Sequence, residues 1–129
     1  MEQILESISR KKKQLEAKRP FPIELEKNLY NWAKMGLTYT SNALEGNTLT
    51  EGETVLVVEK GLTIGGKTVV EHLEALGQAE AIDFIHTLSQ KKKCSDLTVK
   101  DVLEIHRILL EKIDPVNSIC FYCNRDILL

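Results

Sequence analysis

The stretch TEGETVLVVEKGLTIGGKT, Thr50 to Thr68, decides the fold, because its first half is compatible with either a strand or a helix. Its second half, GLTIGGKT, begins at Gly61 and fits the pattern of a phosphate-binding loop. In such a loop the glycines let the backbone surround phosphates, Lys67 supplies positive charge and Thr68 holds a magnesium ion. A phosphate loop also requires a buried strand directly before it, within a parallel sheet. The conformation of TVLVV, residues 54–58, therefore decides between a nucleotide site and an ordinary connection.

Two features of the sequence favour the helix. Thr50 is followed three residues later by Glu53, which forms a helix capping box and predicts a helix from Glu51 to Lys60. The β-branched residues of TVLVV favour a strand, but no second run of such residues accompanies them, and 129 residues are few for a nucleotide-hydrolysing domain. We therefore predict an all-α fold in which GLTIGGKT connects two helices. A nucleotide-binding enzyme that uses GLTIGGKT remains an alternative.

Helical periodicity extends upstream of this stretch. A first helix is predicted over residues 2–18, where apolar positions alternate with Lys and Arg, and the following RPFP ends it. A second, long helix begins at Pro22 and continues to Leu44, where Gly46 and Asn47 stop it. The chain therefore starts with two helices.

Two further capping boxes predict helices downstream. Thr68 is followed by Glu71, and Thr98 is followed by Asp101. The helix after Thr98 carries an apolar stripe that consists of Val99, Val102, Leu103, His106, Leu109, Leu110 and Ile113. His106 lies within this stripe, so we expect a packed core histidine there.

Composition and charge exclude several classes of protein. The formal net charge is −2 and the pI is near 5.9, so no strong field attracts nucleic acid or an anionic membrane. No apolar run approaches the ~18 residues of a membrane span, and the N-terminus lacks the order of a secretory signal. The three cysteines do not make a disulfide framework, which agrees with a reducing compartment. We expect a cytoplasmic protein that binds neither nucleic acid nor membrane.

The segment TYTSNALEGN, residues 38–47, carries an acid in an unfavourable place. Ser41 and Glu45 are four residues apart, so they share a face near the C-terminal end of the long helix. The carbonyl oxygens at that end carry partial negative charge, and an acid there typically costs ~0.3–1 kcal/mol. Either a cation binds Glu45, or Glu45 points to water and Gly46 is simply the helix stop.

The same segment resembles a known family. TSNALEGNTLT closely resembles the inhibitory-helix motif of Fic (Fido) proteins, in which Ser or Thr is followed after three residues by Glu and then by Gly or Asn. The matching positions are Ser41, Glu45 and Gly46. The segments GLTIGGK and IHRILLEKIDP look like later parts of that family in the same order, so the resemblance extends from about Pro20 to Asn117.

The resemblance implies the N-terminal helical part of a Fic/Fido domain. It divides the chain into a helical extension over residues 1–20 and a partial Fic domain over residues 21–129, with the inhibitory helix at about 22–46. The family transfers AMP from ATP, with magnesium, to a hydroxyl of a target protein. Its catalytic motif, H-x-F-x-[DE]-G-N-G-R-x-x-R, is absent from this sequence. The resemblance therefore implies no catalytic residue and no cofactor here, and a chain that is inactive alone.

Two roles remain open for such a chain. In complete relatives the acid that matches Glu45 is implied to pair with the second Arg of the motif and to displace the γ-phosphate of ATP. The chain is either a silent family member, truncated before the catalytic motif, or a regulatory module that inhibits a separate Fic protein. Expected partners are a Fic catalytic domain, or a second copy bound through exposed apolar helix faces.

Cys120 and Cys123 form a CxxC pair near the end of the sequence. A zinc site needs four ligands, and only Cys94 and distant histidines are left to complete it. A redox pair would need a βαβ pattern that the chain lacks. We therefore expect unpaired thiols and no metal site. The histidines His72, His86 and His106 are each followed by residues that do not match the catalytic motif.

Overall fold

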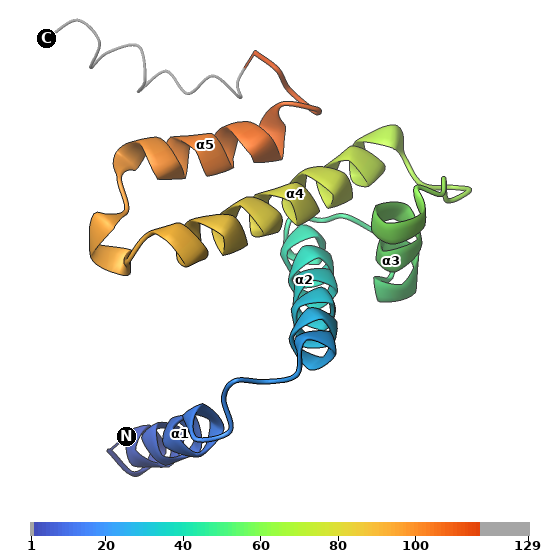
Figure 1. The fold of residues 1–129 in the computed structure, drawn as a ribbon. Coiled ribbons are helices and arrows are strands. Elements are labelled where there is room, and N and C mark those ends of the chain that lie inside the picture. The colour runs from blue at the N-terminus through green and yellow to red at the C-terminus, as the bar shows by residue number, and fades with distance from the viewer. Residues whose placement is uncertain (1, 117–129) are drawn as a thin grey trace, which may run out of the picture. The chain divides into compact units, whose positions relative to one another are not determined.

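The computed structural model describes residues 2–116, and every regular element within that range is a helix (Figure 1). The elements are α1 (Glu2–Glu16), α2 (Ile23–Leu44), α3 (Glu51–Lys60), α4 (Val69–Lys91), the short 3₁₀ helix η1 (Cys94–Asp96) and α5 (Val99–Leu110). The predicted all-α class is confirmed. Internal contacts divide the chain within α2, after residue 31, so the two parts are described separately.

The first part contains α1 and the beginning of α2. The apolar side chains of α1, which are Ile4, Leu5, Ile8 and Leu15, are all more than half exposed, and the helix contributes no buried residue. α1 ends at Glu16, two residues before the predicted limit, and α2 starts one residue after Pro22.

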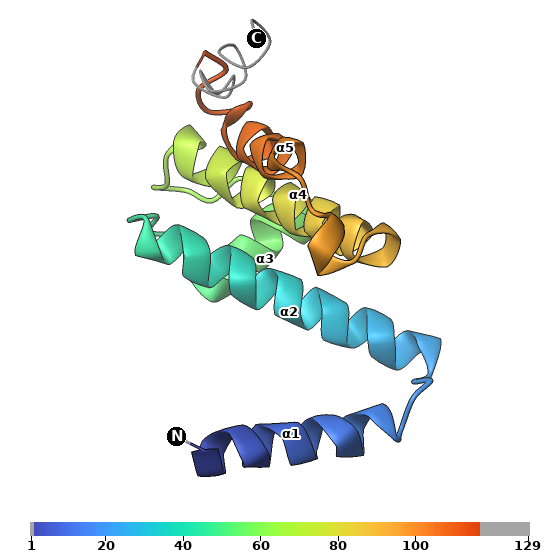
Figure 2. The ribbon, with the colours of Figure 1, turned by 90° about the vertical axis from the view of Figure 1, so that its left-hand side faces the viewer.

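The second part is built around α4, which packs against both α3 and α5. The buried residues of α4 are all small: Ala75, Gly77, Ala79 and Ala81. A Cβ atom at Gly77 would lie 3.0 Å from the carbonyl oxygen of Leu109, so α5 approaches the α4 backbone where no side chain intervenes. Figure 2 shows α5 running back along α4.

The TVLVV stretch lies in α3, and it contributes to the core. Val57 is buried together with Leu49 and Ala75, and Val58, Ile64 and Leu76 pack against this cluster. The predicted helix from Glu51 to Lys60 is confirmed, and its capping box forms. The Thr50 N–H donates to the Glu53 carboxylate at 2.8 Å, and the Glu53 N–H donates to the Thr50 hydroxyl at 3.2 Å. The local capping preference outweighs the β-propensity of the valines.

The other two predicted capping boxes also form, Thr68 with Glu71 at α4 and Thr98 with Asp101 at α5. Both carboxylate oxygens of Asp101 also accept hydrogen bonds from Lys92 at 2.8 Å, and this ammonium is the main reason that the pKa of Asp101 falls to about 2. Along α5, Leu103, His106, Leu109 and Leu110 of the predicted stripe are half-buried, whereas Val99 and Val102 are exposed. Ile113 lies beyond the end of the helix.

Candidate functional site

α2 ends in a glycine stop immediately after Glu45. Gly46 has a φ of +97°, and its N–H donates to the carbonyl of Ala43 at 3.2 Å. The N–H of Asn47 donates to the carbonyl of Asn42 at 3.0 Å, which completes a Schellman motif. Gly46 is therefore the helix stop, and Glu45 occupies the C-cap, where the helix dipole disfavours a negative charge.

Ser41 and Glu45 line a hollow of about 570 Å³ beside α4 and α5. The remaining lining residues are Asn42 and Leu44 of α2, Glu74 and Gln78 of α4, Leu109 and Leu110 at the end of α5, and Ile113 beyond that helix. Glu45 is exposed, and within residues 2–116 no hydrogen bond or ion pair reaches its carboxylate. The Asn42 side-chain nitrogen is buried, also without a partner in that range. The hollow thus presents a carboxylate that no group within residues 2–116 binds.

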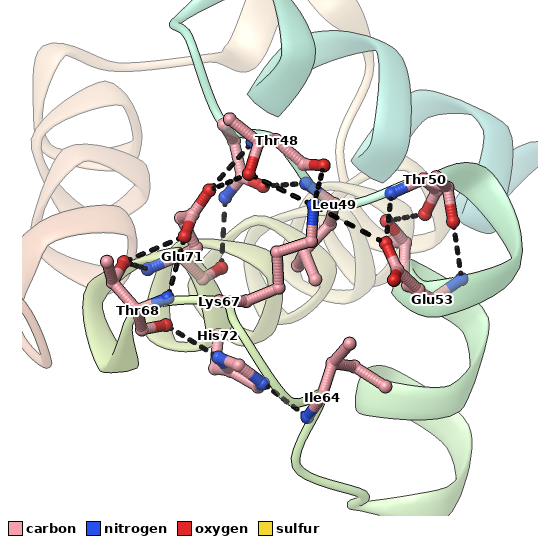
Figure 3. Close-up of polar contacts among 11 residues, drawn as sticks. Thr48, Leu49, Thr50, Glu53, Ile64, Lys67, Thr68, Glu71 and His72 are labelled. Atoms are coloured by element: carbon pink, nitrogen blue, oxygen red, sulfur yellow. Dashed lines mark hydrogen bonds and ion pairs between the residues drawn. The ribbon is translucent and has the colours of Figure 1, made fainter.

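The connection that follows Gly46 is attached to α4 through Glu71 (Figure 3). One carboxylate oxygen of Glu71 accepts hydrogen bonds from the N–H and hydroxyl of Thr48 at 2.8 and 2.5 Å. The other oxygen accepts from the N–H and hydroxyl of Thr68 at 2.7 and 2.9 Å. These donors, the Thr48 hydroxyl foremost, lower the pKa of Glu71 to about 2. Glu71 therefore joins the α2–α3 connection to the first turn of α4.

Asn47 makes a second attachment to α4. Its side-chain nitrogen donates to the carbonyl of Glu71 at 3.0 Å and to the carboxylate of Glu74 at 2.9 Å. Its side-chain oxygen accepts a hydrogen bond from the N–H of Leu49 at 3.0 Å. Glu45 precedes Asn47 by two residues, so its backbone is held close to these attachments.

The segment GLTIGGKT connects α3 to α4 and does not form a phosphate loop. A helix precedes it, and Gly61, with a φ of +64°, is the stop of that helix. The Lys67 ammonium donates to the carbonyl and hydroxyl of Thr48 and lies 3.8 Å from the Glu53 carboxylate. The Thr68 hydroxyl caps α4. The groups that would hold phosphates and magnesium are thus already bonded within the chain.

His72 of α4 also holds the α3–α4 connection in place, through two of its residues (Figure 3). Its Nε2 atom accepts a hydrogen bond from the N–H of Ile64 at 2.9 Å, and its Nδ1 atom lies 2.6 Å from the carbonyl of Thr68. Because Nε2 accepts, the proton of the neutral ring is on Nδ1, which donates to Thr68. His72 therefore has a structural role here.

Two relatives match part of this chain. The chain is 38% identical to "Protein adenylyltransferase fic-1" of Caenorhabditis elegans over 80 residues, which are 62% of this chain and 16% of that protein. It is 41% identical to "Protein adenylyltransferase Fic" of Nematostella vectensis over 81 residues, which are 62% of this chain and 18% of that protein.

A solved structure has the same fold. The chain matches "Fic-1 (aa134 - 508) from C. elegans" with a TM-score of 0.79 and 29% sequence identity, over 89% of this chain and 34% of that one. The chain belongs to the Fic (Fido) family. No family model matches it. The predicted Fic resemblance is confirmed, and this Fic chain spans 16–18% of the length of the two relatives named above.

The structure brings part of the predicted Fic motif together. Ser41 and Glu45 line one hollow, while Gly46 forms the turn that ends α2. Their inhibitory role stays a prediction. Cys120 and Cys123 lie outside the described residues.

Other kinds of site have little support in the described part of the Fic chain. Among residues 2–116, no three His, Cys, Asp or Glu side chains group to hold a metal ion. None of the helices in that range is long and apolar enough to cross a membrane.

Sequence reasoning identifies Ser41 and Glu45 but misses the residues that hold their turn in place. The sequence predicts Glu71 only as half of a capping box, Lys67 only as a phosphate ligand and Asn47 only as a helix stop. The available signal is weak: each of the three side chains has polar atoms beyond those that its predicted role uses. Their tertiary partners lie far away in the sequence, so no local pattern names them.

Proposed function

We propose that this Fic chain is the inhibitory part of a protein adenylyltransferase and that it transfers no AMP by itself. The names of its relatives support AMP transfer to proteins as the activity of the whole protein. The catalytic motif of the family is not among these 129 residues. In this proposal Glu45 is the inhibitory acid. The chemistry, with ATP and magnesium, belongs to the part of a Fic protein that carries the catalytic motif.

One observation carries the proposal: unlike the nearby acids, Glu45 has a carboxylate that accepts no hydrogen bond from residues 2–116. Within residues 2–116 nothing bonds to its carboxylate, although it sits at a helix C-cap where a negative charge is disfavoured. The nearby carboxylates of Glu53, Glu71 and Glu74 all accept hydrogen bonds from within the chain. A cation that enters the hollow would therefore gain a full charge interaction without breaking an existing one.

The chemistry of the hollow favours an arginine as that cation. A guanidinium group binds a carboxylate through two parallel hydrogen bonds and remains charged at any physiological pH. The apolar wall formed by Leu109, Leu110 and Ile113 suits the hydrocarbon stem of such a side chain. An arginine of the Fic catalytic motif that pairs with Glu45 is withdrawn from the γ-phosphate of ATP, so AMP transfer stops.

The open hollow also favours inhibition of a separate Fic protein. Glu45 is exposed, so a second chain reaches it without unfolding α2. We therefore expect the chain to act in trans when a Fic catalytic domain lacks its own inhibitory helix.

The test combines the chain with an active Fic protein from which the inhibitory helix has been removed. We expect no labelled product when the chain alone is incubated with labelled ATP, magnesium and candidate proteins. We expect the wild-type chain to suppress AMP transfer by the active protein, and Glu45→Gln to abolish that suppression. Gln is the appropriate replacement because Gly costs up to ~1 kcal/mol of helix propensity.

Circular dichroism controls for folding, since Glu45→Gln should keep the helical signal of the wild type. Suppression that persists in Glu45→Gln would show that the chain binds through another surface. AMP transfer by the chain alone would show that catalytic residues lie elsewhere in it. If no excess of the chain suppresses the active protein, a silent family member is the better account.

A further inference from the structure

Asn47 uses its whole side-chain amide to connect the end of α2 with α4. The nitrogen donates both of its hydrogens, to the Glu71 carbonyl at 3.0 Å and to the Glu74 carboxylate at 2.9 Å. The oxygen accepts from the Leu49 N–H at 3.0 Å. The backbone N–H of Asn47 closes the Schellman motif on Asn42 at 3.0 Å. One half-buried residue therefore belongs to both the turn and the attachment.

This arrangement requires an amide. Asp has the same size and keeps the oxygen that accepts from Leu49, but it has no hydrogen to donate to Glu71 or Glu74. Its charge would also lie about 3 Å from the Glu74 carboxylate, where like charges repel. The Asn47→Asp substitution therefore removes the attachment to α4 and leaves the local turn acceptor in place.

We propose that Asn47 is a positioning residue for Glu45: its amide fixes the end of α2 on α4, so that the Glu45 carboxylate is held over the hollow. The inference rests on the proposed inhibitory function of Glu45. The two side chains are two positions apart along the chain, and Gly46, the residue between them, has a backbone that is intrinsically permissive. Without the Asn47 amide the backbone hydrogen bonds of the turn remain, but the contacts to Glu71 and Glu74 that fix the orientation of the α2 end on α4 are lost.

The test measures suppression by Asn47→Asp in the same assay with the active Fic protein that lacks its inhibitory helix. We expect residual AMP transfer at saturating chain to rise about three- to tenfold, the effect of one or two net hydrogen bonds. Binding of the chain to the Fic protein, measured by calorimetry, should stay within about threefold, because Asn47 does not line the hollow. A purely structural defect would instead weaken binding and leave suppression at saturation unchanged.

A compensating substitution provides the rescue. In Asn47→Asp with Glu74→Gln, the new glutamine amide donates to the new aspartate, so the hydrogen bond returns with its direction reversed. We expect the double variant to suppress AMP transfer better than Asn47→Asp, because the hydrogen bond to position 74 returns while the one to the Glu71 carbonyl stays lost. Glu74→Gln alone is the reference variant: Asn47 still donates to the glutamine oxygen, but Glu74 also lines the hollow, so the double variant is compared with this single variant and not with the wild type. A double variant no better than Asn47→Asp overturns the inference.

Hydrogen exchange separates this inference from the proposed function, since it needs no enzyme. In the isolated chain the amides of Gly46 and Asn47 should exchange about three- to tenfold faster in Asn47→Asp, and slow again in the double variant. If exchange follows this pattern but even the wild-type chain suppresses nothing, the positioning stands and the inhibitory function fails. Unchanged exchange, or full suppression by Asn47→Asp, shows that Asn47 does not position Glu45.

Discussion

Two connections in this Fic chain share one layout, the α2–α3 connection at residues 45–50 and the α3–α4 connection at residues 61–68. Each has a glycine with positive φ that stops the preceding helix, Gly46 in one and Gly61 in the other. Each ends at a threonine that caps the next helix. They differ in the side chains that remain available for a ligand.

The α3–α4 connection carries the more conspicuous motif, GLTIGGKT, but fewer of its polar side chains are available to a ligand. In residues 61–68 the ammonium of Lys67 and the hydroxyl of Thr68 are bonded to Thr48 and to Glu71. In residues 45–50 the carboxylate of Glu45 has no partner in the described part of the chain. A pattern of letters therefore indicates a ligand site only when its polar groups are not already used by the fold.

The substitution expected to lower the stability of the chain most is Glu71→Gln, because Glu71 accepts hydrogen bonds from both connections. A glutamine keeps one acceptor oxygen and turns an amide toward Thr48 or Thr68, so the backbone N–H of at least one of these residues loses its acceptor. We expect a larger fall in melting temperature than for Thr68→Ala, which removes only a cap and should cost about 0.5–2 kcal/mol.

The matched control for this prediction is Glu111→Gln. Glu111 is exposed and pairs with Arg107 on one helix turn, an interaction typically worth about 0–1 kcal/mol. Equal melting temperatures for Glu71→Gln and Glu111→Gln would show that the Glu71 bonds do not hold the connections together.

A second prediction concerns acid. The folded pKa of Glu71, about 2, lies below its ordinary value of 4.5, so its carboxylate stabilises the folded state above about pH 4.5 and loses that contribution as the pH falls toward 2. The pKa of Asp101 is lowered in the same direction, from 3.8 to about 2, so this carboxylate also stabilises the folded state less as the pH falls. We expect the melting temperature to fall between pH 5 and pH 2, and to fall less steeply in Glu71→Gln. Parallel curves for the two proteins would contradict the assignment of this acid sensitivity to Glu71.

Among the substitutions in the two connections, Lys67→Ala is expected to lower stability least. Loss of its hydrogen bonds to Thr48 should cost about 0.5–1.5 kcal/mol, and ATP affinity should not change, because Lys67 is already bonded within the chain and we expect no phosphate in this loop. Calorimetry with ATP and magnesium measures this directly. Micromolar ATP binding that disappears in Lys67→Ala would restore the phosphate-loop interpretation of GLTIGGKT and remove the contrast between the two connections.

The sequence alone determined the helical class, the starts of α3, α4 and α5, and the stop of α2 at Gly46. The capping boxes of Thr50, Thr68 and Thr98 were readable because each links a threonine to an acid three residues away, within one helical turn. The helix stop at Gly46 was also predictable from a local signal, since it depends on the backbone angle of one residue. These local signals were sufficient to predict α3 correctly, although its valines favour a strand.

Only the tertiary structure decided which polar groups are occupied. The hydrogen bonds from Lys67 to Thr48 and from Asn47 to Glu71 and Glu74 span 19 to 27 residues of sequence. The close approach of α5 at Gly77 depends on how two helices cross. The hollow beside Glu45 likewise needs α2, α4 and α5 together. Local capping is specified by residues within one turn, whereas the availability of Glu45 is a property of everything that packs around it, and no short stretch of sequence contains that information.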